Sequence, residues 1–236
     1  YVRFYPSKFL VRFLFGDITK IPKSPSFVKT RPIKGDNKNS VLFKLNKVRH
    51  FTYTNDRVKF SDKLNILIGR NAVQQKQRID FFKKYFDHPL CNLGQINSGT
   101  THDIWLKNKI SINEQLKYKF ILCIEGYDVA TNLKWVMSSN SIAVMPIPKF
   151  ESWLMEGKLI PNFHYILIKD DFSDLEERLK YYIKNDSKAY EIVKNANKYI
   201  MQFQNKKRED LISLLILEKY FHYSGQINSN FALKDF

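Results

Sequence analysis

The sequence predicts an α/β protein built around a parallel β-sheet. Residues 120–124 form a continuous apolar run, which is typical of a strand that is covered on both faces. Helical periodicity follows from Val129, and a second apolar strand is predicted at 142–145. A strand, a crossover helix and a parallel strand form a right-handed unit, and ligands bind beyond the carboxyl ends of such strands. We therefore expect the loop 125–130 and the helix after it to hold a phosphate-bearing ligand.

The composition indicates a globular protein with a strong positive charge. The chain has 236 residues, of which 44% are hydrophobic, and its formal net charge is +16. This charge favours anionic partners such as nucleic acids, anionic lipids, lipopolysaccharide phosphates or nucleotides, although an AT-rich genome also enriches lysine. Only two cysteines occur, so no disulfide framework is expected and a reducing cytosol fits best. No uncharged run approaches the ~20 residues of a membrane span, and because the sequence begins with Tyr1 we expect a truncated or processed N-terminus.

The first 36 residues are predicted to be mostly extended. A short strand is expected at 13–15, ended by Gly16 and Asp17. An Asp directly after an apolar strand is either a catalytic carboxylate or a turn residue, and the sequence leaves both open. Three prolines keep the following segment extended or turned: Pro22, Pro25 and Pro32.

A helix is predicted next, capped at Asn39 or Ser40 and apolar on one face as far as Val48. Its other face is basic, and such a face is either solvated or in contact with an acceptor or a phosphate. The basic residues are Lys44, Lys47 and Arg49. A polar stretch at 56–63 marks the expected domain boundary.

The middle of the chain continues the strand and helix alternation. We expect strands at 64–68 and 91–93, an exit loop at 69–71, and a helix at 75–86 that Pro89 stops. A polar loop is expected at 94–110, and a capping box at 111–114 predicts a short helix before the central strand. Arg70 and Arg78 are either a cationic clamp for a diphosphate or two surface residues.

The last third is predicted to be mainly helical. A strand is expected at 164–168, followed by a capping box at 173–176 that opens a helix to about 185. Helices are then expected at 189–203 and 209–223. The final helix is apolar enough either to pack against the body of the protein or to lie on a membrane surface.

Several catalytic motifs are absent from the sequence. It contains no Walker A loop, GxGxxG, HExxH or GxSxG motif and no paired-cysteine zinc pattern. Five scattered histidines and the absence of an Asp-x-Asp pair give no indication of a metal-bound diphosphate. Phosphate recognition by strand-end loops, cations and a helix N-terminus remains possible, and it can stabilise a departing nucleoside diphosphate without a metal.

Long ordered motifs resemble glycosyltransferase family 90. The segments 118–126, 132–145 and 151–186 resemble the C-terminal nucleotide-sugar-binding motif of that family. PSFVKTRPI and NSVLFKLNKVRHF are similar to the bacterial lipopolysaccharide core subgroup, and the resemblance extends from about Phe15 to Gly225.

The resemblance implies both an architecture and a reaction. The fold would be of the GT-B type, with two Rossmann-like halves facing across a cleft and an N-terminal half that is short or truncated. The implied segments are an acceptor-side part at 1–56, a nucleotide-sugar-binding domain at 57–205, and a C-terminal helix and tail at 206–236. The implied reaction is inverting and metal-independent, with a UDP-sugar as co-substrate, no cofactor, and a lipopolysaccharide core hydroxyl as acceptor. A cytoplasmic enzyme, in peripheral contact with the anionic inner face of the inner membrane, is expected.

The resemblance also assigns residues to the acceptor side of the site. Asp17 stands where the family has a base, shortly before the segment 25–30. A base must reach the proton of the acceptor hydroxyl that it removes. Lys29 and Arg31 belong to the same acceptor-side segment.

The donor-binding residues are assigned in the same way. Arg70, Arg78, Gly126 and Lys134 match family positions, and Glu151 matches the acidic segment after the next strand. The sequence departs from the family pattern at Asn71, Ala130 and Asn132. Diphosphate binding is therefore expected to depend more on backbone N–H groups, Thr131, Arg70 and Lys134. Donor-binding residues are also expected along the phosphate loop, whose members are Tyr127, Asp128, Val129, Ala130 and Thr131.

Two alternative functions remain open from the sequence. A basic nucleic-acid-binding protein would gather Lys and Arg on one element with stacking aromatics, whereas here the charge is spread over every element. An inactive scaffold that retains the fold is compatible with the departures at Ala130 and Asn132.

Overall fold

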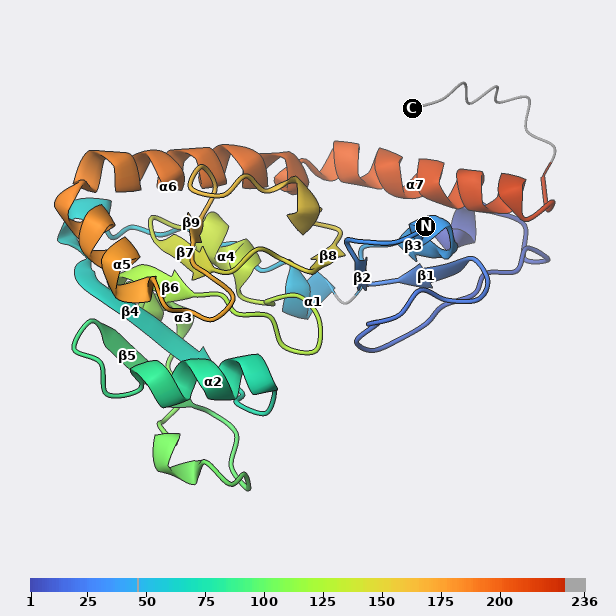
Figure 1. The fold of residues 1–236 in the computed structure, drawn as a ribbon. Helices are drawn as coiled ribbons and strands as arrows, with labels where there is room; N and C mark the ends of the chain where they lie inside the picture. The colour runs from blue at the N-terminus through green and yellow to red at the C-terminus, as the bar shows by residue number, and fades with distance from the viewer. Residues whose placement is uncertain (46, 228–236) are drawn as a thin grey trace.

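The structure, a computed structural model that describes residues 1–45 and 47–227, has a five-stranded parallel sheet as its largest unit (Figure 1). In spatial order the strands are β5 (Cys91–Gln95), β4 (Leu64–Asn71), β6 (Tyr118–Leu122), β7 (Ile142–Met145) and β9 (Ile166–Leu167). The predicted α/β class is confirmed. Each strand lies within a few residues of its predicted place, although β9 is shorter than expected.

The strand order reverses between β4 and β6. In chain order the strands lie as 2-1-3-4-5, so the connections leave β4 in opposite directions. In open α/β sheets the ligand crevice lies at the carboxyl ends of the strands where this reversal occurs. The segments that follow Asn71 and Leu122 meet there, so the fold places the loop 125–130 at this position.

Helices cover both faces of the sheet. They are α2 (Lys76–Tyr85), α3 (Ile112–Gln115), α4 (Leu133–Met137), α5 (Leu175–Lys184) and α6 (Asp186–Met201). Along β6, Phe120 and Leu122 pack in one core with α2 and α5, whereas Ile121 packs in a second core with α4 and the end of α6. Because successive side chains of a strand point to opposite faces, one continuous apolar strand builds both cores.

Residues 1–45 form a smaller part beside the sheet, held by short strands. β1 (Ser26–Val28) pairs in parallel with β3 (Ser40–Leu42), and β2 (Thr30–Pro32) pairs antiparallel with β8 (Phe150–Ser152). Since β8 follows β7 in the chain, the β2–β8 ladder joins this N-terminal part to the large sheet.

The last described helix, α7 (Lys206–Tyr223), lies over the N-terminal part and continues the line of α6 in Figure 1. The Tyr5 hydroxyl donates to the Leu214 carbonyl at 3.0 Å, and the rings of Phe27 and Tyr220 are 4.6 Å apart. Phe221 is fully buried. The expectation that this helix packs against the body is confirmed.

Two predictions for the N-terminal part are wrong. Residues 13–15 form no strand, and Phe13 makes only an isolated bridge to Phe27. The helix predicted from Ser40 is instead the strand β3, and among the described residues of that segment α-helical structure begins only at α1 (Lys47–His50). β3 buries Ser40 and Leu42 against β1, a pairing partner that local periodicity does not reveal.

Three local predictions in the sheet unit also need correction. The expected exit loop at 69–71 belongs to β4, and the helix expected from Val129 begins at Leu133. The capping box at 173–176 does not form, because the Ser173 hydroxyl donates to Asp171. The short helix expected after 111–114 is confirmed as α3, and Ser111 caps it by accepting from the backbone N–H of Glu114 at 3.1 Å, whereas the Glu114 carboxylate pairs with Lys117 instead of closing the box.

The described residues contain one Rossmann-like half. Residues 1–45 contribute three-residue strands rather than a second open sheet, so the two-half architecture stays a prediction. The same holds for the boundaries after 56 and 205, and 228–236 lies outside the described residues. No helix in the described ranges is long and apolar enough to cross a membrane.

Candidate functional site

Arg78 organises the point where the strand order reverses. Its guanidinium donates to the carbonyls of Ala72 at 2.9 Å, Ile124 at 2.9 Å and Glu125 at 3.1 Å. A Cβ on Gly126 would lie 3.2 Å from the same guanidinium, so glycine is what allows this close approach. Arg78 therefore joins the segment after β4 to the loop after β6. Burial lowers its pKa, and its donors serve the backbone.

Glu125 fixes the same loop to the start of β8. One carboxylate oxygen accepts from the backbone N–H groups of Lys149 and Phe150, both at 3.0 Å. Burial raises the pKa of Glu125 to about 7, although these two hydrogen bonds act in the opposite direction. The sequence analysis did not assign a role to Glu125, although an acidic residue directly after a buried apolar run is a recognisable signal.

A chain of charges connects the loop to the N-terminal part. The Lys29 ammonium lies 2.5 Å from Asp17 and 3.1 Å from Asp128, and the Thr30 hydroxyl donates to Asp128 at 2.7 Å. The Asp128 and Lys29 side chains are largely buried, whereas that of Asp17 is 41% exposed. The structure thus brings the predicted base, the predicted acceptor-side lysine and the predicted phosphate loop together.

Arg31 and Glu151 form a second link between the same two parts. They face each other across the β2–β8 ladder, and the guanidinium contacts one Glu151 oxygen at 2.9 and 2.8 Å. Arg31 also donates to the Ser40 carbonyl at 3.0 Å. Predicted for opposite sides of the site, these two residues are paired directly.

Lys134 lies inside the protein rather than on the loop surface. Its ammonium is 2.7 Å from Glu156, and both side chains are almost fully buried. Glu156 also accepts from the hydroxyl and the backbone N–H of Ser152. In this arrangement Lys134 does not face a ligand at the strand ends.

Arg70 does not converge with Arg78. Its guanidinium donates to the Gly69 carbonyl at 3.0 Å and to the Asn92 carbonyl at 2.9 Å, which directs it toward β5. Burial lowers its pKa. The two arginines therefore do not form the predicted clamp in this structure.

The phosphate loop itself is divided between core and surface. Val129 and Ala130 are buried, Thr131 is half-buried, and the Tyr127 ring is 60% exposed. Since α4 has only five residues, little dipole can build up at its N-terminus. Backbone N–H groups, the half-buried Thr131 hydroxyl and the Tyr127 ring are what the loop can offer a ligand.

His50 is a buried residue near these charges that the sequence did not single out. Burial, followed by the Lys134 and Lys29 charges, lowers its pKa to about 4, so the imidazole is neutral at pH 7. Its Nε2 atom has no hydrogen-bond partner. Within the described ranges no three His, Cys, Asp or Glu residues are grouped as metal ligands.

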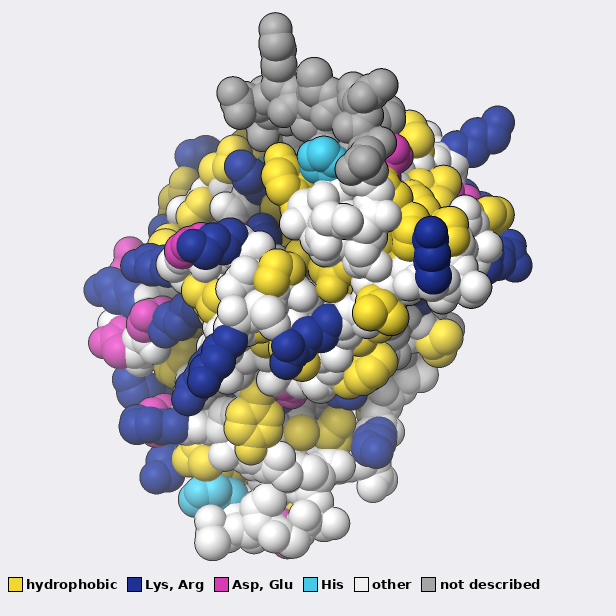
Figure 2. All heavy atoms as spheres, turned by 90° about the vertical axis from the view of Figure 1, so that its right-hand side faces the viewer, with side chains coloured by type: hydrophobic (Ala, Val, Ile, Leu, Met, Phe, Trp, Pro, Cys, Tyr) yellow, Lys and Arg dark blue, Asp and Glu magenta, His cyan; other side chains and the backbone are white. Residues whose placement is uncertain are grey.

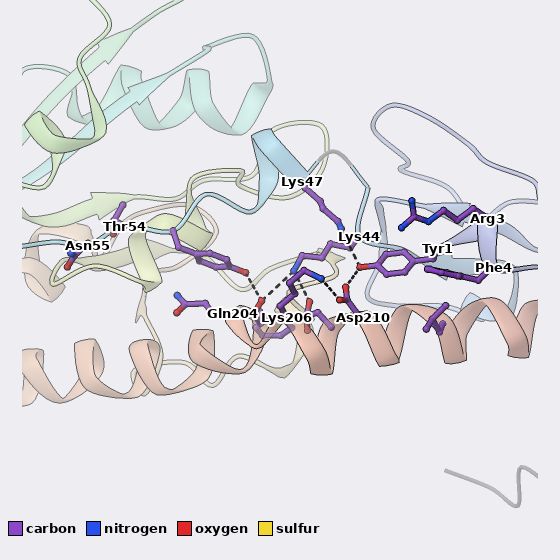
Figure 3. Close-up of a pocket in the computed structure, with 14 residues that line it drawn as sticks. Tyr1, Arg3, Phe4, Lys44, Lys47, Thr54, Asn55, Gln204, Lys206 and Asp210 are labelled. Carbon is purple, nitrogen blue, oxygen red and sulfur yellow. Dashed lines mark hydrogen bonds and ion pairs between the residues drawn. The ribbon is translucent and has the colours of Figure 1, made fainter.

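The cavity at the strand ends is small, and larger ones lie elsewhere. About 200 Å³ is enclosed by the loops after β6, β7 and β9, including Glu125 and Gly126, which is less than the ~300–1,000 Å³ of usual ligand pockets. A cavity of about 1040 Å³ with a mixed polar and apolar lining lies between Tyr1, Lys44 and α7 (Figure 3). A more apolar groove of about 960 Å³ runs between β3, Trp153 and α7.

The protein has a doubly wound α/β fold: a parallel sheet is covered by helices on both faces, and polar loops lie where its strand order reverses. Proteins with such folds bind ligands at that position. The sequence model described as Glycosyl transferase family 90 matches residues 47–222. The chain belongs to glycosyltransferase family 90 and is a glycosyltransferase.

Individual relatives are consistent with this membership. The chain is 42% identical over 220 residues to the O-glucosyltransferase LpsA of Dichelobacter nodosus, covering 93% of this chain and 69% of that protein. An uncharacterized protein of Invertebrate iridescent virus 6 is 32% identical over 100 residues, which are 40% of this chain and 8% of that protein.

A solved structure gives a weaker match. It is the C-terminal domain of a glycosyl transferase group 1 family protein (LpcC) from Francisella tularensis, with 13% identity and a TM-score of 0.42. The match covers 65% of this chain and 95% of that one, and its score is too low to establish a shared fold.

Proposed function

We propose that this glycosyltransferase moves a hexose from a UDP-sugar to a saccharide hydroxyl, with inversion and without a metal. The observation that supports this most is the contact chain from Asp17 through Lys29 to Asp128, because it brings a carboxylate of the N-terminal part to the loop after the central strand. Glucose is the proposed hexose, since the LpsA relative is an O-glucosyltransferase.

The proposed reaction is a single displacement. Asp17 accepts the proton of the acceptor hydroxyl, the hydroxyl oxygen attacks the anomeric carbon, and the bond from that carbon to the diphosphate breaks. UDP leaves with the electron pair of that bond. A partly exposed carboxylate can serve as base because it need only take the proton as the new bond forms.

The donor is proposed to lie over the loop 126–131, with backbone N–H groups toward the diphosphate and the exposed Tyr127 ring toward the base or the sugar. Arg78 holds this loop in place. Arg70 and Lys134 pair with other protein groups, so in this proposal they do not contact the donor. Arg31 and Glu151 fix the distance between the N-terminal part and the sheet unit.

The proposed acceptor is lipopolysaccharide core, reached at an anionic membrane surface on the cytoplasmic side. Residues 1–45 contain ten Lys or Arg but only two Asp or Glu. On the face in Figure 2, Lys and Arg side chains are interspersed with separate groups of hydrophobic side chains. Such a surface attracts anionic lipid, so binding to vesicles with phosphatidylglycerol should fall as salt rises.

A donor panel tests the proposal directly. Thermal shift with UDP-glucose, UDP-galactose and UDP-N-acetyl sugars should show stabilisation by at least one UDP-sugar, and transfer should persist in EDTA. Asp17→Asn should lower transfer by roughly 10²–10⁴-fold while the chain still binds the donor. Full transfer by Asp17→Asn would reject Asp17 as the base, and stabilisation by none of the UDP-sugars would reject the donor class.

A further inference from the structure

The three cationic side chains that the sequence predicted at the diphosphate form hydrogen bonds or ion pairs with other protein groups. Lys134 is buried with Glu156, Arg70 donates to β5, and Arg78 donates to three backbone carbonyls. A positive charge close to a departing diphosphate stabilises it beyond what backbone N–H groups supply. Among the described residues, Lys29 is the cation whose ammonium touches a side chain of the phosphate loop, that of Asp128.

The Lys29 ammonium contacts two carboxylates at once. Its ammonium reaches Asp17 at 2.5 Å and Asp128 at 3.1 Å, and its side chain is 12% exposed. Asp128 has a second donor, the Thr30 hydroxyl at 2.7 Å, so it stays anchored if Lys29 moves. Within the described part of the chain the Asp17 side chain contacts no other charged or hydrogen-bonding group, and Asp17 is the more exposed of the two acids.

We propose that Lys29 contacts the diphosphate of the bound donor and that it releases Asp17 when it does so. A diphosphate carries more negative charge than one carboxylate and offers more acceptor oxygens, so it competes well for an ammonium group. The freed Asp17 oxygen then accepts the proton of the acceptor hydroxyl. Donor binding thereby makes the base available, and the donor binds before the acceptor reacts.

The first test compares UDP with uridine by calorimetry, and it rests on the proposed function. Lys29→Met should weaken UDP binding by about tenfold or more, as expected for a lost charge-assisted contact, and should leave uridine binding unchanged. Lys29→Arg should restore part of the UDP affinity. Lys34→Met removes the same charge from an exposed lysine of the same segment and should change neither affinity.

The second test uses the competition for Lys29. Asp17→Asn should tighten UDP binding by roughly two- to fivefold, because it removes a partly exposed competitor. In the Lys29→Met background the same change should have no effect. A purely structural role of Lys29 would not produce this dependence.

The outcomes separate this inference from the proposed function. If Lys29→Met binds UDP as tightly as the unaltered chain, the inference is wrong but the proposed function stands. The same conclusion follows if only Lys149→Met weakens UDP binding, because Lys149 is the other lysine beside the loop. Equal loss of UDP and uridine binding in Lys29→Met also overturns it. If the unaltered chain binds no nucleoside diphosphate, the proposed function fails and the inference fails with it.

Discussion

Glu209 connects three parts of the molecule through one buried carboxylate. It lies on α7 and accepts from the Lys44 ammonium at 2.8 Å and from the Trp153 indole N–H at 2.6 Å. Its partners thus come from the N-terminal part and from the segment after β8. A buried acceptor with two such donors cannot be replaced without leaving them unsatisfied.

Replacing Glu209 by alanine should therefore be costly. We expect the free energy of unfolding to fall by about 3–5 kcal/mol, because a mostly buried lysine loses its counterion. Urea titration followed by tryptophan fluorescence measures this change. Glu114→Ala breaks an exposed ion pair with Lys117 and should cost no more than about 1 kcal/mol. Equal effects of the two substitutions would contradict the assigned role of Glu209.

At the residue scale, the sequence predicted which residues lie near the strand ends better than it predicted which groups their side chains contact. Arg78 and Gly126 were predicted to bind the donor, and both lie where the strand order reverses, but the Arg78 guanidinium packs where a Cβ of Gly126 would be and donates to backbone carbonyls. Lys134 was expected to face the ligand, yet its partner Glu156 lies 22 residues further along the chain. The Thr30–Asp128 contact spans 98 residues. Contacts of this range are set by the tertiary fold and leave no local pattern.

At the scale of elements, continuous apolar strands were predicted well and short ones were not. Residues 120–122 of β6 are apolar because both faces of this strand are covered. β3 has only three residues, too few to distinguish a strand from a helical period, and its parallel partner β1 lies earlier in the chain. Short elements held by tertiary pairing are thus the ones that sequence patterns misassign.

Glu125, which links β6 to the start of β8, predicts a pH dependence. Its folded pKa of about 7 lies above its ordinary value of 4.5, so the folded state binds more protons in this range. Its contribution to stability is present below pH 4.5 and is lost as the pH rises through 7. The free energy of unfolding of Glu125→Gln, taken relative to that of the unaltered chain, should therefore rise by up to roughly 3 kcal/mol between pH 4.5 and pH 8.

Urea titrations at both pH values measure this difference. His50 affects stability in the opposite direction. Its folded pKa of about 4 lies below the ordinary value of 6.5, so its contribution to stability is lost as the pH falls from 6.5 to 4. The Glu125→Gln chain should consequently show a clearer loss of stability toward pH 4 than the unaltered chain. A difference between the two chains that stays constant with pH would reject the assignment for Glu125.

For the whole molecule, three connections make the N-terminal part and the sheet unit interdependent. They are the β2–β8 ladder, the Asp17–Lys29–Asp128 contacts, and α7, which continues from α6 over residues 1–45 (Figure 1). The sequence predicted a cleft between two halves and an Asp on the far side of it. It did not predict that α7 would cover the N-terminal part, because a helix's apolar stripe does not identify the surface that it meets.

Phe221 tests whether the two parts unfold together. It is fully buried on α7, with ring centroids 4.9 Å from Tyr5 and 4.8 Å from Phe9, so Phe221→Ala should cost about 3–5 kcal/mol. Because the connections join both parts, far-UV circular dichroism and tryptophan fluorescence should report one shared transition at lower urea. The neighbouring Tyr223 is 70% exposed, and Tyr223→Ala should change stability by no more than about 0.5 kcal/mol. Two separated transitions in Phe221→Ala would mean that the N-terminal part can detach while the sheet stays folded, and the charge contacts at Lys29 would then form only after docking.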